Sequence, residues 1–142
     1  PWVRSAAVSA YSVQPGAVPE DLREFLEGDD LMMKTSVIDA LGKMASAGSV
    51  SAMDIIESVY EQSGLEMKRS ICRILGVIRD PRAFGLLTAA MEDTDSGIRT
   101  FAVQALAQRG EPEAAELLVR AAEADSDRIV RNTARTLLES DS

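Results

Sequence analysis

Apolar positions recur along this chain with a period of about thirty residues. Five segments begin with an apolar residue followed by a basic one, and their starts are 30, 34, 31 and 32 residues apart. Further apolar residues stand four, seven and eight positions after each start, which traces one face of an α-helix. The five starts are Val3-Arg4, Met33-Lys34, Met67-Lys68, Ile98-Arg99 and Val130-Arg131. A helical pattern repeated at this interval predicts a solenoid, in which each repeat packs on its neighbours.

A second amphipathic helix is predicted in each complete repeat. Pro81 and Pro112 each precede apolar residues at helical spacing, and proline suits the first turn of a helix because its missing N–H has no partner there. The sequence has no strand pattern, so we predict a single all-α domain of about four helix pairs plus a final capping helix. We place the repeats at about 1–29, 30–63, 64–94, 95–126 and, in part, 127–142.

Aspartates are spaced to cap the first helix of several repeats. Asp30, Asp95 and Asp127 each stand three residues before an apolar start, where a carboxylate can accept from free backbone N–H groups. The third repeat has Gly64 at this position, and we expect Ser63 to substitute for the aspartate.

One stretch of the chain carries the motif of a known family. Residues 75–83 read LGVIRDPRA and are followed at helical spacing by Leu86-Leu87, Asp95 and Ile98-Arg99. This motif resembles the HEAT-like repeat of the phycobilisome-lyase type, and the resemblance is strongest from about Met67 to Leu138. It implies a right-handed α-α superhelix of the HEAT/armadillo kind, with the second helix of each repeat on the concave surface.

Composition helps to decide among the functions known for HEAT-like repeats. The chain has 15 basic and 23 acidic residues, a net charge of −8 and no histidine. The deoxyhypusine hydroxylases of this kind would imply His-Glu iron sites, which the absence of histidine excludes. The DNA glycosylases would imply a basic concave face, and an acidic chain is repelled by nucleic acid. A protein–protein interaction scaffold is the preferred prediction, and a phycobilin lyase subunit that handles a bilin-bearing partner is the alternative.

The second helices carry acidic residues away from their apolar faces. The candidate partner-binding residues are Asp54, Glu57, Glu61, Glu92, Glu113, Glu116 and Glu123, together with Arg82 and Arg120. One interpretation is an acidic groove that binds a basic peptide or a basic protein surface. The other is a solvated face that keeps an Ala-rich chain in solution. Glutamates at helical spacing without accompanying aromatic residues are weak evidence for acid–base catalysis, so we predict no catalytic residue, cofactor or metal site.

Two further features are interpreted as structural. A basic residue recurs at one helical position in every repeat, as Arg4, Lys34, Lys68, Arg99 and Arg131. We expect these bases to pair with carboxylates of the neighbouring repeat, such as Asp95 or Asp127, rather than to bind an anion. The single cysteine, Cys72, is expected to be a small core residue, and it cannot form an intramolecular disulfide.

The two ends of the pattern differ in polarity. The last segment carries polar residues on its outer side, which suits a terminal cap, namely Arg128, Arg131, Asn132 and Arg135. The first segment carries Trp2 and Tyr11 instead, so we expect it to self-associate or to pack on further repeats. A chain that opens on Pro1 inside a patterned segment suggests a fragment of a longer protein. With no long apolar run and one cysteine, we expect a cytoplasmic location and no membrane span.

Overall fold

The computed structural model describes residues 18–140, and every regular element within that range is a helix. This confirms the prediction of an all-α solenoid. The elements are α2 (Glu20–Arg23), η1 (Glu24–Leu26), α3 (Leu31–Ser46), α4 (Val50–Tyr60), α5 (Leu65–Leu75), α6 (Pro81–Ala90), α7 (Ser96–Arg109), α8 (Pro112–Ala124) and α9 (Arg128–Ser140). The helix predicted for the first segment, with Trp2 and Tyr11, falls outside the described residues.

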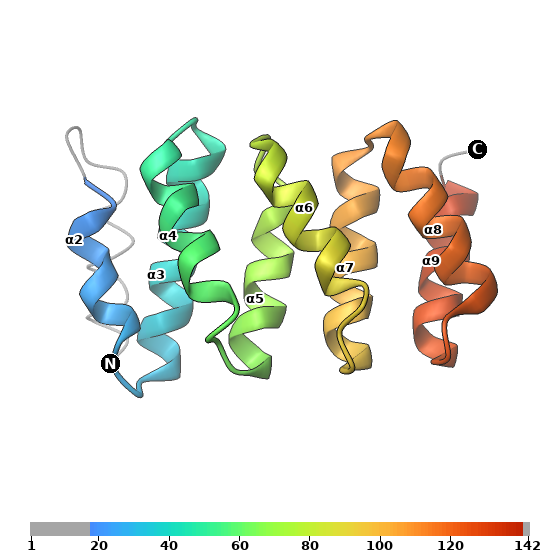
Figure 1. Ribbon diagram of the computed structural model, residues 1–142, viewed down its shortest axis with the longest axis horizontal. Coiled ribbons are helices and arrows are strands. Elements are labelled where there is room, and N and C mark those ends of the chain that lie inside the picture. The colour runs from blue at the N-terminus through green and yellow to red at the C-terminus, as the bar shows by residue number, and fades with distance from the viewer. Residues whose placement is uncertain (1–17, 141–142) are drawn as a thin grey trace.

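The helices form two layers that run along the long axis of the molecule (Figure 1). The first helices of the repeats, α3, α5 and α7, lie in one layer with α9. The second helices, α4, α6 and α8, lie in the other layer and face the viewer in Figure 1. None of the helices described is both long and apolar enough to cross a membrane.

The two layers are packed to different extents. Neighbouring first helices contact each other along the row from α3 to α9, whereas α4 and α6 touch only briefly and α6 and α8 barely meet. The second helices therefore form the more loosely packed layer. That they line a concave surface stays a prediction.

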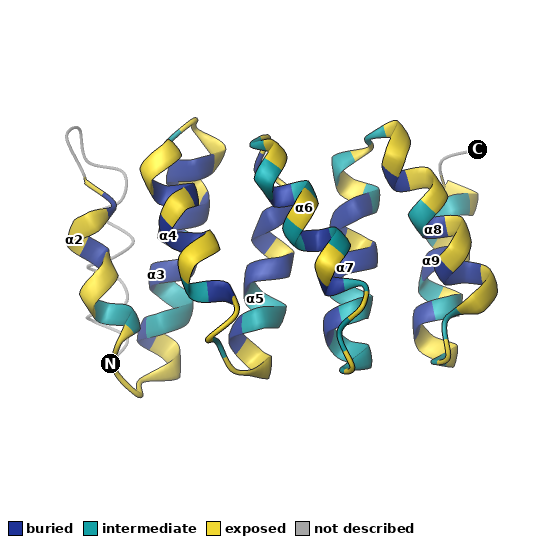
Figure 2. Ribbon diagram, viewed as in Figure 1, coloured by how far each residue is buried: buried dark blue, intermediate teal, exposed yellow. Residues whose placement is uncertain are grey.

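The core lies between the layers and repeats with the helices (Figure 2). The predicted helix starts Met33, Met67, Ile98 and Val130 are all buried. The leucines eight positions after the second, third and fourth starts are fully buried, namely Leu41, Leu75 and Leu106. Leu137 and Leu138 of α9 are only half-buried, and among the described helices α9 packs mainly on α7 and α8.

Side-chain caps mark where several helices begin. Asp30, Asp95 and Asp127 accept hydrogen bonds from N–H groups in the first turns of α3, α7 and α9, as predicted. The substitution predicted for α5 is wrong, because the Ser63 hydroxyl donates to the Val59 carbonyl and Gly64 caps that helix without a side chain.

Glycine is required at two helix ends. Gly110 ends α7 with φ of 68°, a left-handed conformation that few other residues adopt readily. Gly76 ends α5 against the neighbouring repeat, where a Cβ atom would lie 3.1 Å from the Ala105 Cα atom. The bare backbone at Gly76 thus lets α5 and α7 approach each other closely.

Candidate functional site

The carboxylates of the last two inter-repeat turns are tied to basic residues of the preceding repeat. Lys68 lies 4.0 Å from an Asp93 oxygen, and Arg99 bonds both carboxylate oxygens of Asp125 at 3.0 and 3.1 Å. Arg69 makes a similar bidentate contact with Asp95, donating from Nε to Oδ2 and from Nη2 to Oδ1. These pairs join consecutive repeats, which confirms the predicted structural role for Lys68 and Arg99.

The partners differ in detail from the predicted ones. The recurring bases meet Asp93 and Asp125, which stand five residues before a helix start, and not Asp95 and Asp127. The latter two are occupied as helix caps. Lys34 makes no ion pair among the described residues, and Arg131 donates to the Asp125 backbone carbonyl.

These contacts shift the acid–base equilibria of the turn. The hydrogen bond from the Ile98 amide, aided by Arg69, lowers the pKa of Asp95. Burial acts to raise the pKa of Asp125, but the Arg99 guanidinium and the Asp127 amide outweigh it and the pKa is lowered. The pKa of Arg99 is raised in turn by its bond to Asp125. Each pair therefore stays ionised across the neutral range.

The acidic residues predicted to bind a partner fall into groups on the second-helix layer. Arg82 of α6 lies at the centre of one group, 2.5 Å from Asp54, 3.6 Å from Glu57 and 3.0 Å from Asp80. The hydrogen bond from Arg82 lowers the pKa of Asp80, and the pKa of Arg82 is raised. One guanidinium thus pairs with three carboxylates, and the group keeps a net negative charge.

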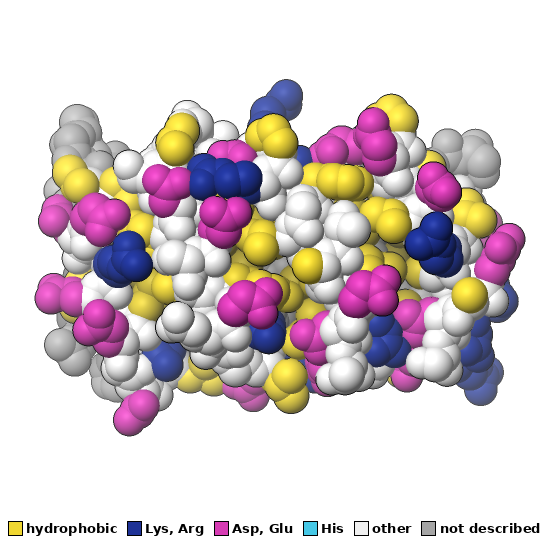
Figure 3. Space-filling model, in the orientation of Figure 1, with side chains coloured by type: hydrophobic (Ala, Val, Ile, Leu, Met, Phe, Trp, Pro, Cys, Tyr) yellow, Lys and Arg dark blue, Asp and Glu magenta, His cyan; other side chains and the backbone are white. Residues whose placement is uncertain are grey.

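A second group follows α8. Glu113, Glu116, Arg120 and Glu123 recur at helical spacing and are all exposed. The single ion pair among them, between Glu116 and Arg120, is 4.0 Å long and open to solvent, so its contribution to stability is small. Figure 3 shows this layer as separate acidic side chains with few basic ones between them.

The remaining predicted residues stand alone. Glu61 follows the end of α4 and Glu92 follows the end of α6, and both are exposed. The structure thus brings Asp54, Glu57 and Arg82 together and keeps the α8 residues on a different helix, so the nine residues do not form one continuous groove.

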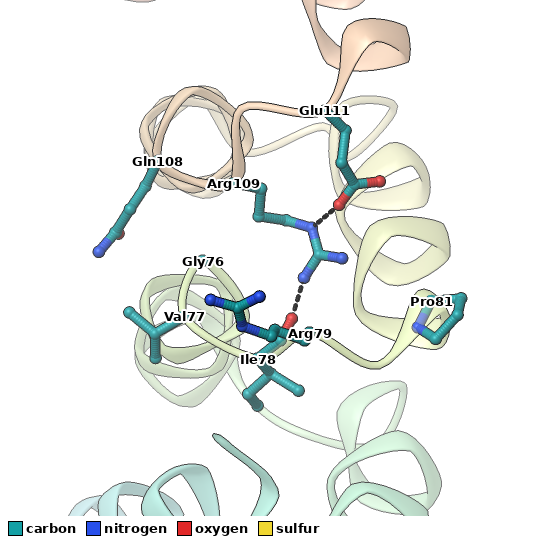
Figure 4. A pocket seen from close by; sticks show the side chains of 8 residues that line it. All are labelled: Gly76, Val77, Ile78, Arg79, Pro81, Gln108, Arg109 and Glu111. Atoms are coloured by element: carbon teal, nitrogen blue, oxygen red, sulfur yellow. Dashed lines mark hydrogen bonds and ion pairs between the residues drawn. The ribbon is translucent and has the colours of Figure 1, made fainter. Parts of the chain in front are cut away.

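A pocket of about 600 Å³ lies where the turn after α5 meets the end of α7. Arg109 dominates it (Figure 4), donating to the Leu75 carbonyl at 3.1 Å, to the Ile78 carbonyl and to the Glu111 carboxylate. Its side chain is only 6% exposed. Because carbonyls and a carboxylate already balance its charge, Arg109 fixes the turn to α7 rather than offering an anion site.

The role of Arg109 was not predicted from the sequence, because this residue stands outside the repeated apolar pattern. Its position beside the helix-ending Gly110 was the available signal, since basic side chains often bond to carbonyls near helix ends.

Cys72 is fully buried beside Tyr60, with its sulfur 3.8 Å from the tyrosine hydroxyl. Burial raises the pKa of the Cys72 thiol to about 11. The predicted core role is confirmed, because a buried thiol with a raised pKa is a poor nucleophile. Among the described residues no cluster of acidic or thiol side chains could hold a metal ion.

Known proteins resemble this chain at the level of the repeat. A sequence model of HEAT repeats matches residues 61–139. The chain belongs to the HEAT repeat family. The match names HEAT repeats in general, so the lyase-type assignment stays a prediction. No curated protein matches the chain.

A solved structure supports the same fold. Human deoxyhypusine hydroxylase in complex with glycerol aligns with a TM-score of 0.71 at 22% identity, over 86% of this chain and 42% of that one. At this identity the likeness shows the fold alone, and this HEAT repeat chain spans less than half of the hydroxylase.

Proposed function

We propose that this HEAT repeat chain is a non-catalytic scaffold that binds a partner protein carrying basic residues through its second-helix layer. One observation supports the proposal above the others. Four exposed carboxylates of this layer make no ion pair in the part of the chain described, namely Glu61, Glu92, Glu113 and Glu123. Exposed charges of one sign attract a partner of the opposite sign and orient its approach.

The α8 surface is the centre of the proposed contact. Glu113 and Glu123 lie on the same side of α8 as Glu116, and Val119 beside them is 42% exposed. An acidic stripe next to an apolar side chain suits an amphipathic basic segment, which would bury its apolar residues while its charges meet the glutamates.

The α4–α6 part of the layer contributes less in this proposal. Arg82 already pairs with Asp54 and Glu57, so a basic partner would have to compete with it for these carboxylates. Charge reversals at Glu113 and Glu123 therefore test partner binding more directly than a reversal at Glu57, which would also break an ion pair within the protein.

Affinity capture with matched baits tests the proposal. We expect the wild-type chain to retain a protein that the double variant Glu113→Lys/Glu123→Lys does not. The control Glu24→Lys/Glu66→Lys changes the net charge equally at exposed positions away from α8 and should retain it. Equal retention by both variants, with helical circular dichroism unchanged, would assign binding to another surface.

A further inference from the structure

The junction between the second and third repeats lacks the acidic residues that the later junctions contain. Asp93 and Asp95 precede the start at Ile98, and Asp125 and Asp127 precede the start at Val130, at the same spacing. The corresponding residues before Met67 are Gln62 and Gly64. This junction therefore has no carboxylate at either position.

The basic residue that would meet such a carboxylate is nevertheless present. Lys34 is equivalent in the repeat to Lys68 and Arg99, which pair with Asp93 and Asp125. The half-buried Lys34 makes no ion pair among the described residues, because Gln62 stands where the other junctions have an aspartate. Of the three equivalent bases, Lys34 is thus the one that makes no ion pair within residues 18–140.

A cavity of about 450 Å³ lies beside this lysine. Lys34, Arg23 and Glu27 supply its charged lining, and Leu26, Ile38 and Met67 supply apolar surface. Within the described part of the chain, Arg23 makes only long contacts, at 3.5 Å to the Ser58 hydroxyl and 3.9 Å to Glu20. Two positive charges and one negative charge leave the lining with a net charge of +1, which matches a single anionic group.

We propose that this cavity binds a small monocarboxylate with a short aliphatic body. Its carboxylate would take the place of the missing aspartate at Lys34, and its aliphatic part would lie on the apolar lining. Glu27 disfavours dianions by like-charge repulsion. The volume lies in the range of small-molecule pockets. The site is separate from the α8 surface and does not depend on the proposed function.

Titration with hexanoate, followed by the amide NMR shifts of the whole chain, tests this site. We expect saturable shifts at Lys34 and at Gln62, Ser63 and Gly64. Hexylamine, which has the same body and the opposite charge, should cause none there. Shifts from both compounds alike, or no saturable shift at these residues, would overturn the proposal.

Two variants separate the site from general effects on stability. Lys34→Met should weaken hexanoate binding at least about tenfold, whereas Lys43→Met, on the same helix but outside the cavity, should not. Gln62→Asp supplies the missing carboxylate, so it should block hexanoate and raise the melting temperature, while Gln62→Asn should retain binding. Hexanoate binding unchanged by Gln62→Asp would contradict the proposal even if Lys34→Met failed to fold.

Discussion

The aspartates of the inter-repeat turns serve two purposes, helix capping and pairing with a base of the preceding repeat. Asp95 and Asp127 accept from backbone amides at helix starts, and Asp93 and Asp125 meet the bases of the preceding repeat. Asp95 also holds Arg69, so a single carboxylate caps α7 and links it to α5. Removal of such a residue loses a helix cap and an inter-repeat contact together.

This arrangement predicts acid sensitivity. Because the folded-state pKa values of Asp80, Asp95 and Asp125 are lowered, these groups stabilise the fold above the ordinary aspartate pKa of about 4. That stability is lost as the pH falls through their lower folded-state values. The free energy of unfolding in urea should therefore fall below about pH 4, and Asp95→Asn should reduce the steepness of this fall. An unchanged pH profile in Asp95→Asn would show that Asp95 contributes nothing to it.

Sequence reasoning succeeded where the signal was local. The caps at Asp30, Asp95 and Asp127 follow from spacing alone, and so does the burial of Cys72 in the apolar stripe of its helix. The partners of the recurring bases were misjudged by two residues, because the side chains best placed for pairing were those not engaged as caps. Whether a side chain is already engaged depends on tertiary geometry, which periodicity does not contain.

At the scale of the helices, the apolar register decides stability. Leu106 is fully buried in α7 and was predicted to be so from its place in the repeat. Leu106→Ala should lower the free energy of unfolding by about 2–5 kcal/mol. Val119→Ala removes a partly exposed side chain and should cost less than about 1 kcal/mol. Urea unfolding of the two variants measures the difference, and similar costs would contradict the register.

The sequence pattern did not predict the helix contacts that require a glycine. A Cβ atom at Gly76 would lie 2.8 Å from the Gln108 Oε1 atom and 3.1 Å from the Ala105 Cα atom, whereas one at Gly85 would meet nothing within 4 Å. Gly76→Ala should therefore destabilise the fold by forcing α5 and α7 apart. Gly85→Ala, within α6, should stabilise it by about 0.4–1 kcal/mol. Thermal melting of both variants checks the prediction, and equal shifts of one sign would contradict it.

At the scale of the whole molecule, the solenoid was predictable and its accessible surfaces were not. Periodicity fixed the order and pairing of the helices. It did not show that Arg82 neutralises part of the acidic layer, nor that the first helices are the more closely packed row. Both features depend on how far neighbouring repeats spread apart, and a one-dimensional pattern does not specify that distance.

The central claim is that the acidic surface on α8 receives a basic partner. Its most direct test is an NMR titration with a basic amphipathic peptide that carries lysine and leucine at helical spacing. The account predicts shifts concentrated on α8, around Glu113, Glu116 and Glu123, and an affinity that falls as salt screens the charges over about 8–10 Å. Shifts concentrated on α3, α5 and α7, or an affinity indifferent to both salt and Glu113→Lys/Glu123→Lys, would contradict it.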